Sequence, residues 1–461
     1  MLSKSDFMKY KRCPCELWLQ KCRPDLLPPA DAGLEHVFAM GNQVDREARL
    51  LFPGGHEVQG FVFDGWRNTQ KALSEGHEAI FQPTVVADQI HARADILTRN
   101  RAQGSWDIRE VKMTTKVKEE HIIDLAFQLT CFRTAHVEVS KTYVVHVNPR
   151  YVRHGEINPQ KLFTMEDVTE EVRKEVLRVK REIPKALEIT KWGRKPTQKN
   201  VDACVNTETC EFLGYYLHEL PAAIREELME LRAGEPRRNP PVIAIDADRI
   251  RRALSGLHQP FQFLDYETYS PAIPMFDGYR PYEAVTFQYS LHVQAESGAK
   301  PSHDAYLHDK LSDPAPSLAA HLREHSRPGG AFIAWYATFE KTRNDEMARR
   351  LPSFAQFFAS VNQRMFDPIN LFKKKGGAYF HSDFGGSASL KKVLPVIVPE
   401  LSYKGLAIQK GDVASYSWPT LIDPTVPAEK RKTLRENMLE YCGLDTLAMV
   451  KIMEHLKQVS T

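Results

Sequence analysis

Apolar residues before residue 190 switch between the two-residue alternation of strands and the three-to-four-residue spacing of helices. Apolar or alternating runs predict strands at 79–86, 90–98, 106–113 and 141–147. Helical spacing predicts helices at 40–51, at 119–134 and over the charged segment 166–189. Strands and helices mixed in this way predict an α/β sheet domain.

A second α/β pattern follows residues 232–241, which have the proline, glycine and charge content of a linker. Strands are predicted at 261–268, 285–293, 304–308 and 332–336, and helices at 317–324, 339–350 and 434–459. Three strands, a helix, a strand and a helix suit a ribonuclease-H-like sheet. We therefore expect an N-terminal domain over 1–231, a linker over 232–259 and a C-terminal domain over 260–461.

Composition narrows the class of protein. The 461 residues are 42% hydrophobic and 26% charged, as in globular proteins of two or three domains. No apolar run approaches the roughly 18 residues of a membrane span, and the N-terminus lacks the apolar core of an export signal, so a cytoplasmic protein without a membrane partner is expected. The net charge is only +3, so any surface that binds nucleic acid must be local.

The segment Phe-Gln-Phe-Leu-Asp-Tyr-Glu carries two carboxylates, Asp265 and Glu267, on a predicted strand. Residues two apart on a strand face the same side, with Leu264 and Tyr266 on the other. Two adjacent like charges repel unless a cation lies between them, and Mg²⁺ or Mn²⁺ prefers such oxygen ligands. The alternative is an exposed acidic strand end without a ligand.

The last predicted helix adds a third carboxylate. Asp445 lies within its apolar stripe, one turn after Tyr441. A carboxylate on a buried face is costly unless it is paired or binds a metal ion. Because Tyr441 and Asp445 are four residues apart, they share one face of the helix and can serve one site. The alternative is a buried aspartate that caps a helix or forms an ion pair.

These motifs resemble the DnaQ-like exonucleases, which have four acidic residues and a tyrosine. The resemblance covers about residues 260–458 and implies a 3′–5′ exonuclease with two Mg²⁺ or Mn²⁺ ions. It assigns the metal ligands to Asp265, Glu267, Glu340 and Asp445, with Asp265 bridging both ions. Tyr441 would orient the attacking water. Glu340 stands where the family commonly has aspartate, and Asp367 is a further candidate near the site.

The N-terminal half contains Asp95 and, fifteen residues later, the strand pair Glu110-x-Lys112. Carboxylates that hold a metal beside a lysine form a plausible set for cleaving phosphodiesters, although Glu-x-Lys is also common on exposed strands. Together with the helix motif of Gln128 and the earlier Asp45, these residues resemble the RecB family of PD-(D/E)XK nucleases. The resemblance implies a restriction-endonuclease-like fold over about residues 1–217, with catalytic roles for Asp95, Glu110, Lys112 and Gln128. Asp45 replaces a metal-binding histidine, and Phe132 replaces a tyrosine.

Cysteines extend this second resemblance to CRISPR-associated exonucleases, which hold an iron–sulfur cluster with one early and three late cysteines. The matching residues are Cys13, Cys204 and Cys210. The last expected cysteine is Tyr216, so a cluster would need Cys15 or Cys22 as its fourth ligand. We expect that the cluster has been lost and that the protein is colourless.

The two halves together resemble an uncharacterised bacterial family that joins a RecB-like nuclease to a DnaQ-like exonuclease, and the run from Phe384 to Pro395 fits its C-terminal region. The side chains of Ser387, Ser389, Lys391 and Lys392 in this run are candidates for phosphate contacts. The expected partner is DNA or RNA, as single strands or ends. Two alternatives stay open: a nucleic-acid-binding protein with one or both sites inactive, and a structural metal-binding protein.

Overall fold

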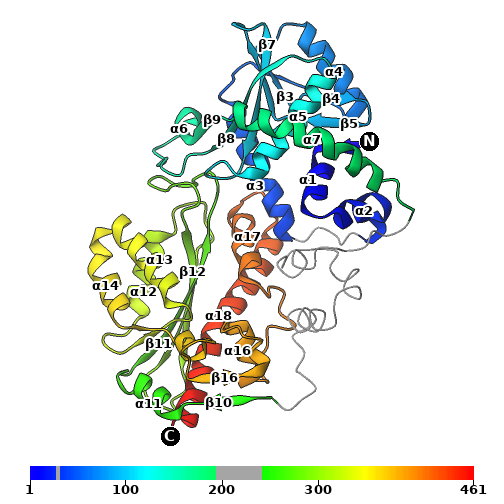
Figure 1. Ribbon diagram of the computed structural model, residues 1–461. Coiled ribbons are helices and arrows are strands. Elements are labelled where there is room, and N and C mark those ends of the chain that lie inside the picture. Colours follow the sequence, from blue (N-terminus) through cyan, green and yellow to red (C-terminus); the bar gives the residue numbers. More distant parts are fainter. Residues whose placement is uncertain (27–31, 194–240) are drawn as a thin grey trace. The chain divides into compact units, whose positions relative to one another are not determined.

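The computed structural model describes residues 1–26, 32–193 and 241–461 (Figure 1). The chain forms two compact units, each a mixture of helices and sheets, as the α/β prediction required. Unit 1 comprises Met1–Glu226 and Pro271–Tyr282, and unit 2 comprises Glu227–Ser270 and Glu283–Thr461. The predicted domain limits therefore differ from the observed ones, because the short segment 271–282 packs with unit 1. None of the helices within the described ranges combines the length and the apolar character that crossing a bilayer requires.

Unit 1 is built on a mixed six-stranded sheet with the order β2-β3-β6-β7-β8-β9. The central strands β7 and β8 run parallel, and β7 is antiparallel to β6. The strands are β2 (His56–Glu57), β3 (Ala79–Phe81), β6 (Ile96–Asn100), β7 (Ser105–Lys112), β8 (Val139–Val147) and β9 (Phe163–Asp167). A smaller sheet has the order β1-β5-β4, from β1 (Leu2–Ser3), β5 (Ile90–Arg93) and β4 (Thr84–Ala87).

Two strands that the sequence predicted as continuous are each divided between these sheets. The run 79–86 becomes β3 and β4, and the run 90–98 becomes β5 and β6. Gln82 separates β3 from β4 with a left-handed backbone (φ 54°), which a pleated strand cannot accommodate. Asp95 lies at the second division, between β5 and β6.

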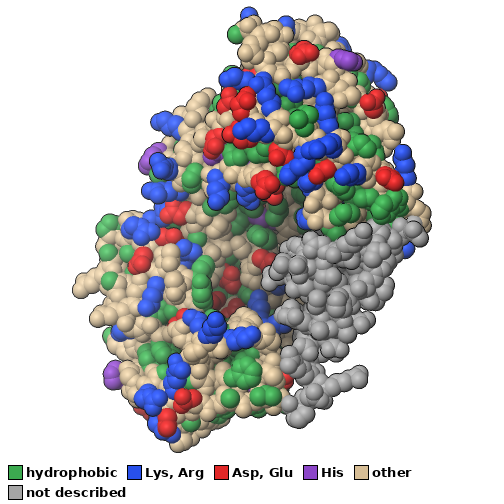
Figure 2. All heavy atoms as spheres, viewed as in Figure 1, with side chains coloured by type: hydrophobic (Ala, Val, Ile, Leu, Met, Phe, Trp, Pro, Cys, Tyr) green, Lys and Arg blue, Asp and Glu red, His purple; other side chains and the backbone are tan. Residues whose placement is uncertain are grey.

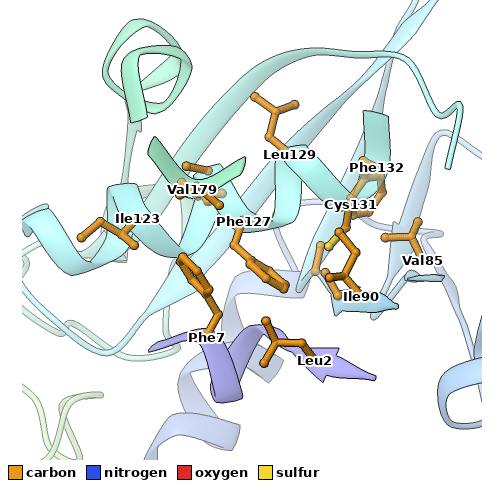
Figure 3. Close-up of a cluster of buried hydrophobic side chains, with 14 of the residues drawn as sticks. Leu2, Phe7, Val85, Ile90, Ile123, Phe127, Leu129, Cys131, Phe132 and Val179 are labelled. Carbon is orange, nitrogen blue, oxygen red and sulfur yellow. The ribbon is translucent and has the colours of Figure 1, made fainter. Parts of the chain in front are cut away.

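Helices cover both faces of the six-stranded sheet. One face packs against α1 (Lys4–Arg12), α2 (Pro14–Cys22), α5 (Glu119–Thr134) and α7 (Thr169–Ile189). Figure 3 shows the centre of this core, where Phe127 and Phe132 of α5 lie near Leu2, Phe7 and Ile90. The other face packs against α3 (Ala32–Arg49), whose Val44 and Ala48 are buried. The other α-helices in the described part of unit 1 are α4 (Val62–Ser74) and α6 (Pro159–Leu162).

Unit 2 contains a five-stranded sheet with the order β13-β12-β11-β14-β15. The first three strands in sequence are antiparallel neighbours, and β14 and β15 run parallel to β11. The strands are β11 (Phe261–Tyr269), β12 (Val285–Gln294), β13 (Ser302–Leu307), β14 (Phe332–Ile333) and β15 (Met365–Phe366). The predicted strand 332–336 is shorter than expected because Tyr336 adopts a left-handed conformation (φ 67°) just before the next helix.

Helices also enclose the unit 2 sheet on two sides (Figure 1). One face carries α12 (Ala315–His325), α13 (Ala337–Arg350) and α14 (Ala355–Gln363). The other face carries α17 (Gly411–Ile422) and the long α18 (Ala428–Val459), with α16 (Leu390–Ile397) packed on α18. A four-residue helix, α15 (Ile369–Phe372), precedes β16 (Tyr379–His381).

The predicted linker 232–259 is wrong in its described part, because residues 243–255 form regular structure within unit 2. Strand β10 (Ile243–Ile245) pairs antiparallel with β16. Helix α11 (Ala247–Ser255) follows and packs on α18 through the fully buried Ile250. The Asp246 side chain caps α11 by accepting a hydrogen bond from the Arg249 amide at 2.9 Å.

Candidate active sites in the two units

Strand β11 presents Asp265 and Glu267 on the face that α18 covers. Their neighbours Leu264 and Tyr266 are buried on the opposite face, within the core formed with α12 and α13. The predicted alternation is therefore confirmed. Glu267 is only 8% exposed, whereas Asp265 is half-buried.

Helix α18 brings Tyr441 and Asp445 to this face one turn apart. Asp445 is buried, and its Oδ1 accepts a hydrogen bond from the hydroxyl of Tyr403. Tyr441 also interacts with this carboxylate. The polar partners of Asp445 in the described structure are thus phenol hydroxyls, so neither of the predicted alternatives, capping or ion pairing, accounts for its burial.

Glu340, in the first turn of α13, joins the same group. It is 2% exposed and interacts electrostatically with Asp265 and Glu267. Its Oε2 is buried and has no hydrogen-bond partner among the described residues. A buried carboxylate oxygen without a donor is costly, so a role limited to the helix dipole does not explain this geometry.

Burial and mutual repulsion dominate the electrostatics of these four residues, which we call the carboxylate site. Burial first, and then the neighbouring carboxylates, raise the pKa values of Asp265, Glu267 and Glu340 well above their usual range. Burial also raises the pKa of Asp445 to about 6. Such a group of oxygens, one of them orphaned, fits a divalent cation, which would favour the ionised forms.

Cys442 is a component of this site that no sequence motif indicated. Its Sγ lies 3.6 Å from Asp265 Oδ2, and one atom each of Asp265, Glu267 and Cys442 fall within 4.8 Å of one another. Burial raises the pKa of the Cys442 thiol well above its usual value, so the sulfur is protonated without a metal. It therefore adds a soft donor to a set of hard oxygens.

Lys391, one of the predicted phosphate contacts, lies beside this site. Its Nζ lies 5.0 Å from the ring centroid of Tyr441 and 5.5 Å from that of Tyr403, and the side chain is exposed. Its charge opposes the raised pKa values of Asp265, Glu267 and Asp445. No sequence motif pointed to Tyr403, because a loop between α16 and α17 carries it.

Asp367 does not join the carboxylate site. Its Oδ1 and Oδ2 accept hydrogen bonds from the amides of Tyr336 at 3.1 Å and Ala337 at 3.0 Å. The Ile369 amide donates a third bond to Oδ1 at 3.1 Å. Asp367 thus holds the strained turn at the start of α13, which sets the position of Glu340 three residues further on.

The predicted site of unit 1 is also assembled, but its charges are already paired. Glu110 and Lys112 share a face of β7, with Lys112 Nζ 2.8 Å from Glu110 Oε1. Gln128 of α5 donates to Glu110 Oε2 at 2.7 Å. Two residues were missed: Lys4 Nζ lies 2.7 Å from Glu110 Oε1, and Asp124 Oδ2 lies 2.6 Å from Lys112 Nζ. Lys4, Glu110, Lys112 and Asp124 form a charge-neutral group that we call the lysine cluster.

The cluster stabilises the ionised form of its carboxylate. Burial opposes ionisation of Glu110, but the ammonium groups of Lys112 and Lys4 outweigh it and hold the pKa of Glu110 below its usual value. The same carboxylates raise the pKa values of both lysines against the effect of burial. A metal ion at Glu110 would face two ammonium groups, so this part of the predicted ligand set fits a cation poorly.

Asp45 and Asp95 lie beside a separate pocket of about 370 Å³ in unit 1. Burial, and then Glu110, raise the pKa of Asp95 to about 7, and its Oδ2 accepts a hydrogen bond from the Val111 amide at 2.8 Å. Asp45 pairs with Arg49 at 2.6 Å through Oδ2, while its Oδ1 is buried and has no hydrogen-bond partner in the described ranges. Asp45 therefore has an oxygen without a hydrogen-bond partner, and both aspartates border the pocket.

The remaining predictions for unit 1 have separate outcomes. Phe132 is fully buried in the α5 core, one turn beyond Gln128 and outside the polar cluster. Cys13 lies between α1 and α2, where its hydrogen bond with Cys15 lowers the pKa of Cys13 to about 6. Leu17 and Trp18, which follow these cysteines in α2, are buried. The later members of the cysteine motif, Cys204, Cys210 and Tyr216, lie outside the described residues.

Comparison with known proteins gives similarity without an activity. Residues 262–389 match a family described as "Domain of unknown function (DUF2779)". The chain is 24% identical over 215 residues to "Uncharacterized protein MG366 homolog" of Mycoplasma pneumoniae. This alignment covers 43% of this chain and 32% of that protein. It is 23% identical over 220 residues to "Uncharacterized protein MG366" of Mycoplasma genitalium, covering 44% and 33%. The matched part therefore spans about a third of the length of these curated relatives.

Proposed function

We propose that this protein is a metal-dependent nuclease and that unit 2 is its 3′–5′ exonuclease. The observation that carries the proposal is the convergence of Asp265, Glu267, Glu340 and Asp445 from three separate elements, next to Tyr441. Structural roles rarely require four neighbouring carboxylates with little exposure and with pKa values raised by burial, whereas sites for divalent cations do.

The topology of unit 2 supports the same proposal. Its sheet order, with three antiparallel strands followed by two strands parallel to the first, is the order expected of a ribonuclease-H-like domain. The carboxylates come from the first strand, from the helix after the fourth strand and from the last helix, as the resemblance to DnaQ-like exonucleases implies.

Each residue has a part in the proposed reaction. Bound Mg²⁺ or Mn²⁺ would supply an activated water and would neutralise charge on the phosphate. Asp265 and Glu267 would hold cations from strand β11, and Tyr403 fixes the orientation of Asp445 through its hydrogen bond. Tyr441 would position the water, and Lys391 would attract the phosphate backbone towards the site.

End-labelled single-stranded DNA and RNA, incubated with the full chain and Mn²⁺, test this function. We expect metal-dependent shortening from the 3′ end. Asp265→Asn should reduce the rate by about 10²- to 10³-fold, the usual effect of removing one preorganised electrostatic group. Glu296→Gln, at an exposed position of the same unit, is the matched control and should leave the rate unchanged. Full activity of Asp265→Asn would show that the assignment is wrong.

A second candidate function concerns unit 1 and rests on the lysine cluster. This candidate is that unit 1 binds nucleic acid without cleaving it, because Lys4 and Lys112 already neutralise Glu110 and leave it a poor metal ligand. In an Asp265→Asn background, this candidate predicts metal-independent binding without residual cleavage. Residual cleavage that Asp95→Asn removes would instead assign a second active site to unit 1.

A further inference from the structure

Three side chains on the opposite face of the unit 2 sheet form a group that the proposed nuclease does not use. Asp304 lies on β13, and His321 and His325 lie one turn apart on α12. Asp304 pairs with Leu291, whose side chain is buried under α12, whereas Asp265 pairs with Ser290 on the face of α18. This histidine group is therefore separated from the carboxylate site by the sheet itself.

The spacing within the group suits metal ligands better than hydrogen bonds. One ligand atom from each of the three side chains lies within 4.8 Å of the other two. Asp304 Oδ1 lies 3.7 Å from His325 Nε2, and Asp304 Oδ2 lies 3.5 Å from His321 Nδ1. Two ligands on a tetrahedral Zn²⁺ with bonds of about 2.0–2.1 Å stand roughly 3.3–3.4 Å apart. Small movements of these partly exposed side chains cover the difference.

Neighbouring groups already orient these ligands. His325 Nδ1 contacts the His321 carbonyl oxygen at 2.9 Å, which places a hydrogen on Nδ1 and leaves the lone pair on Nε2, the nitrogen that faces Asp304. The Tyr289 hydroxyl donates to Asp304 Oδ2 at 2.6 Å. A ligating imidazole or carboxylate normally has such an outer hydrogen bond. An ion bound through His321 Nδ1 would replace the contact of 2.6 Å between that nitrogen and the Tyr289 oxygen.

Chemistry and exposure indicate the kind of ion. Two imidazoles with one carboxylate favour Zn²⁺ over Mg²⁺, which prefers oxygen ligands alone. The side chains of Asp304, His321 and His325 are 29%, 31% and 36% exposed, so solvent reaches the group. We propose that these three side chains form a second metal site, which binds Zn²⁺ through three protein ligands and one water molecule.

Binding here joins β13, at the edge of the sheet, to the helix that covers it. β13 has a paired neighbour only on its β12 side within the described sheet, so its other edge relies on side-chain contacts. An ion held by one residue of β13 and two of α12 adds a cross-link between them. Because the ion binds the folded state, Zn²⁺ should raise the melting temperature of the protein.

Titration of Zn²⁺ into the chelator-treated full chain tests the site, with free Zn²⁺ followed by a competing indicator dye. Asp304→Asn and His325→Ala should each lose one equivalent of bound Zn²⁺ and most of the Zn²⁺-dependent rise in melting temperature. His258→Ala, at an exposed histidine of the same unit, should bind as the wild type does. Asp265→Asn should keep this equivalent, so the result does not depend on the nuclease proposal.

Tyr289→Phe removes only the outer hydrogen bond and should weaken this equivalent by about 10- to 100-fold. Circular dichroism of the metal-free variants verifies that each one is folded. If folded Asp304→Asn and His325→Ala proteins both bind Zn²⁺ with wild-type stoichiometry and affinity, the site does not exist.

Discussion

The carboxylate site of unit 2 and the lysine cluster of unit 1 place buried carboxylates in opposite electrostatic surroundings. In unit 2, Asp265, Glu267 and Glu340 face one another, and their pKa values rise. In unit 1, two ammonium groups face Glu110, and its pKa falls. The first arrangement gains from an added cation, and the second is already neutral. Similar sequence signals, acidic residues on central strands, thus lead to different capacities for metal.

The lysine cluster should be the more sensitive of the two to loss of a charge. Glu110→Gln leaves Lys4 and Lys112 with one carboxylate between them, and breaking a buried pair costs about 3–5 kcal/mol of unfolding free energy. Chemical denaturation of the full chain measures this. Glu119→Gln, an exposed neighbour at the start of α5, should change the stability by less than about 0.5 kcal/mol. A loss below about 1 kcal/mol for Glu110→Gln would mean that the cluster is not tightly paired.

A buried histidine behind the carboxylate site should make unit 2 sensitive to acid. Burial, and then His303, lower the pKa of His292 to about 4, and its Nδ1 lies 2.7 Å from the Thr446 hydroxyl on α18. Between pH 4 and 6.5 this imidazole is protonated in the unfolded chain but neutral in the folded protein, so the free energy of unfolding rises with pH across this window. The total rise is about 3 kcal/mol.

His292→Gln keeps a hydrogen-bonding side chain and should remove this part of the pH dependence. The measurement is the free energy of unfolding at several pH values, wild type against variant, with chelator present. Parallel curves for the two proteins between pH 4 and 6.5 would contradict the buried neutral imidazole.

Removal of one carboxylate from unit 2 should have the opposite sign to the change at Glu110. Without metal, Asp265→Asn relieves repulsion from Asp445 and should stabilise the protein by on the order of 1 kcal/mol. With Mn²⁺ the order should reverse, because the wild type gains binding energy that the variant lacks. Melting temperatures with chelator and with Mn²⁺ measure both effects, and a destabilised metal-free variant would argue for an unrecognised partner of Asp265.

The smallest expected effect concerns Lys391, whose exposed side chain lies beside the carboxylate site. Lys391→Ala should weaken binding of single-stranded nucleic acid and should slightly lower the melting temperature of the metal-free protein, because its charge offsets the repulsion among the carboxylates. The slope of log affinity against log salt should fall by about 1, as for one lost phosphate contact. Lys300→Ala, at an exposed lysine in the loop before β13, is the control, and it should leave this slope as in the wild type. An unchanged slope for Lys391→Ala would remove this lysine from the binding surface.

Figure 2 shows Lys and Arg side chains interspersed with Asp and Glu side chains over the drawn face of each unit. A net charge of +3 is consistent with this mixture. Attraction of a polyanion would then depend on single lysines near a site rather than on the field of the whole molecule. The substitution at Lys391 therefore measures a local property.

Local patterns were sufficient for the elements and for residues that share one element. The two-residue alternation placed Asp265 and Glu267 on one face of β11, and the helical repeat placed Tyr441 and Asp445 together on α18. Helix α5 has the predicted limits, Glu119–Thr134. These features depend on backbone geometry that neighbouring residues determine, so a single sequence contains them.

Partners from distant segments could be decided only by the tertiary structure. Lys4 and Glu110 are 106 positions apart, and Tyr403 and Asp445 are 42 apart, so neither pair leaves a periodic trace. Gln82 divides a predicted strand through its left-handed backbone conformation. The pattern of hydrophobic residues carries no information on this backbone angle, so the division could not be predicted. Whether a carboxylate is free for a metal or already neutralised depends on which cation the fold brings beside it. The sequence identifies the acidic residues, and the packing around each one decides whether its charge is already neutralised.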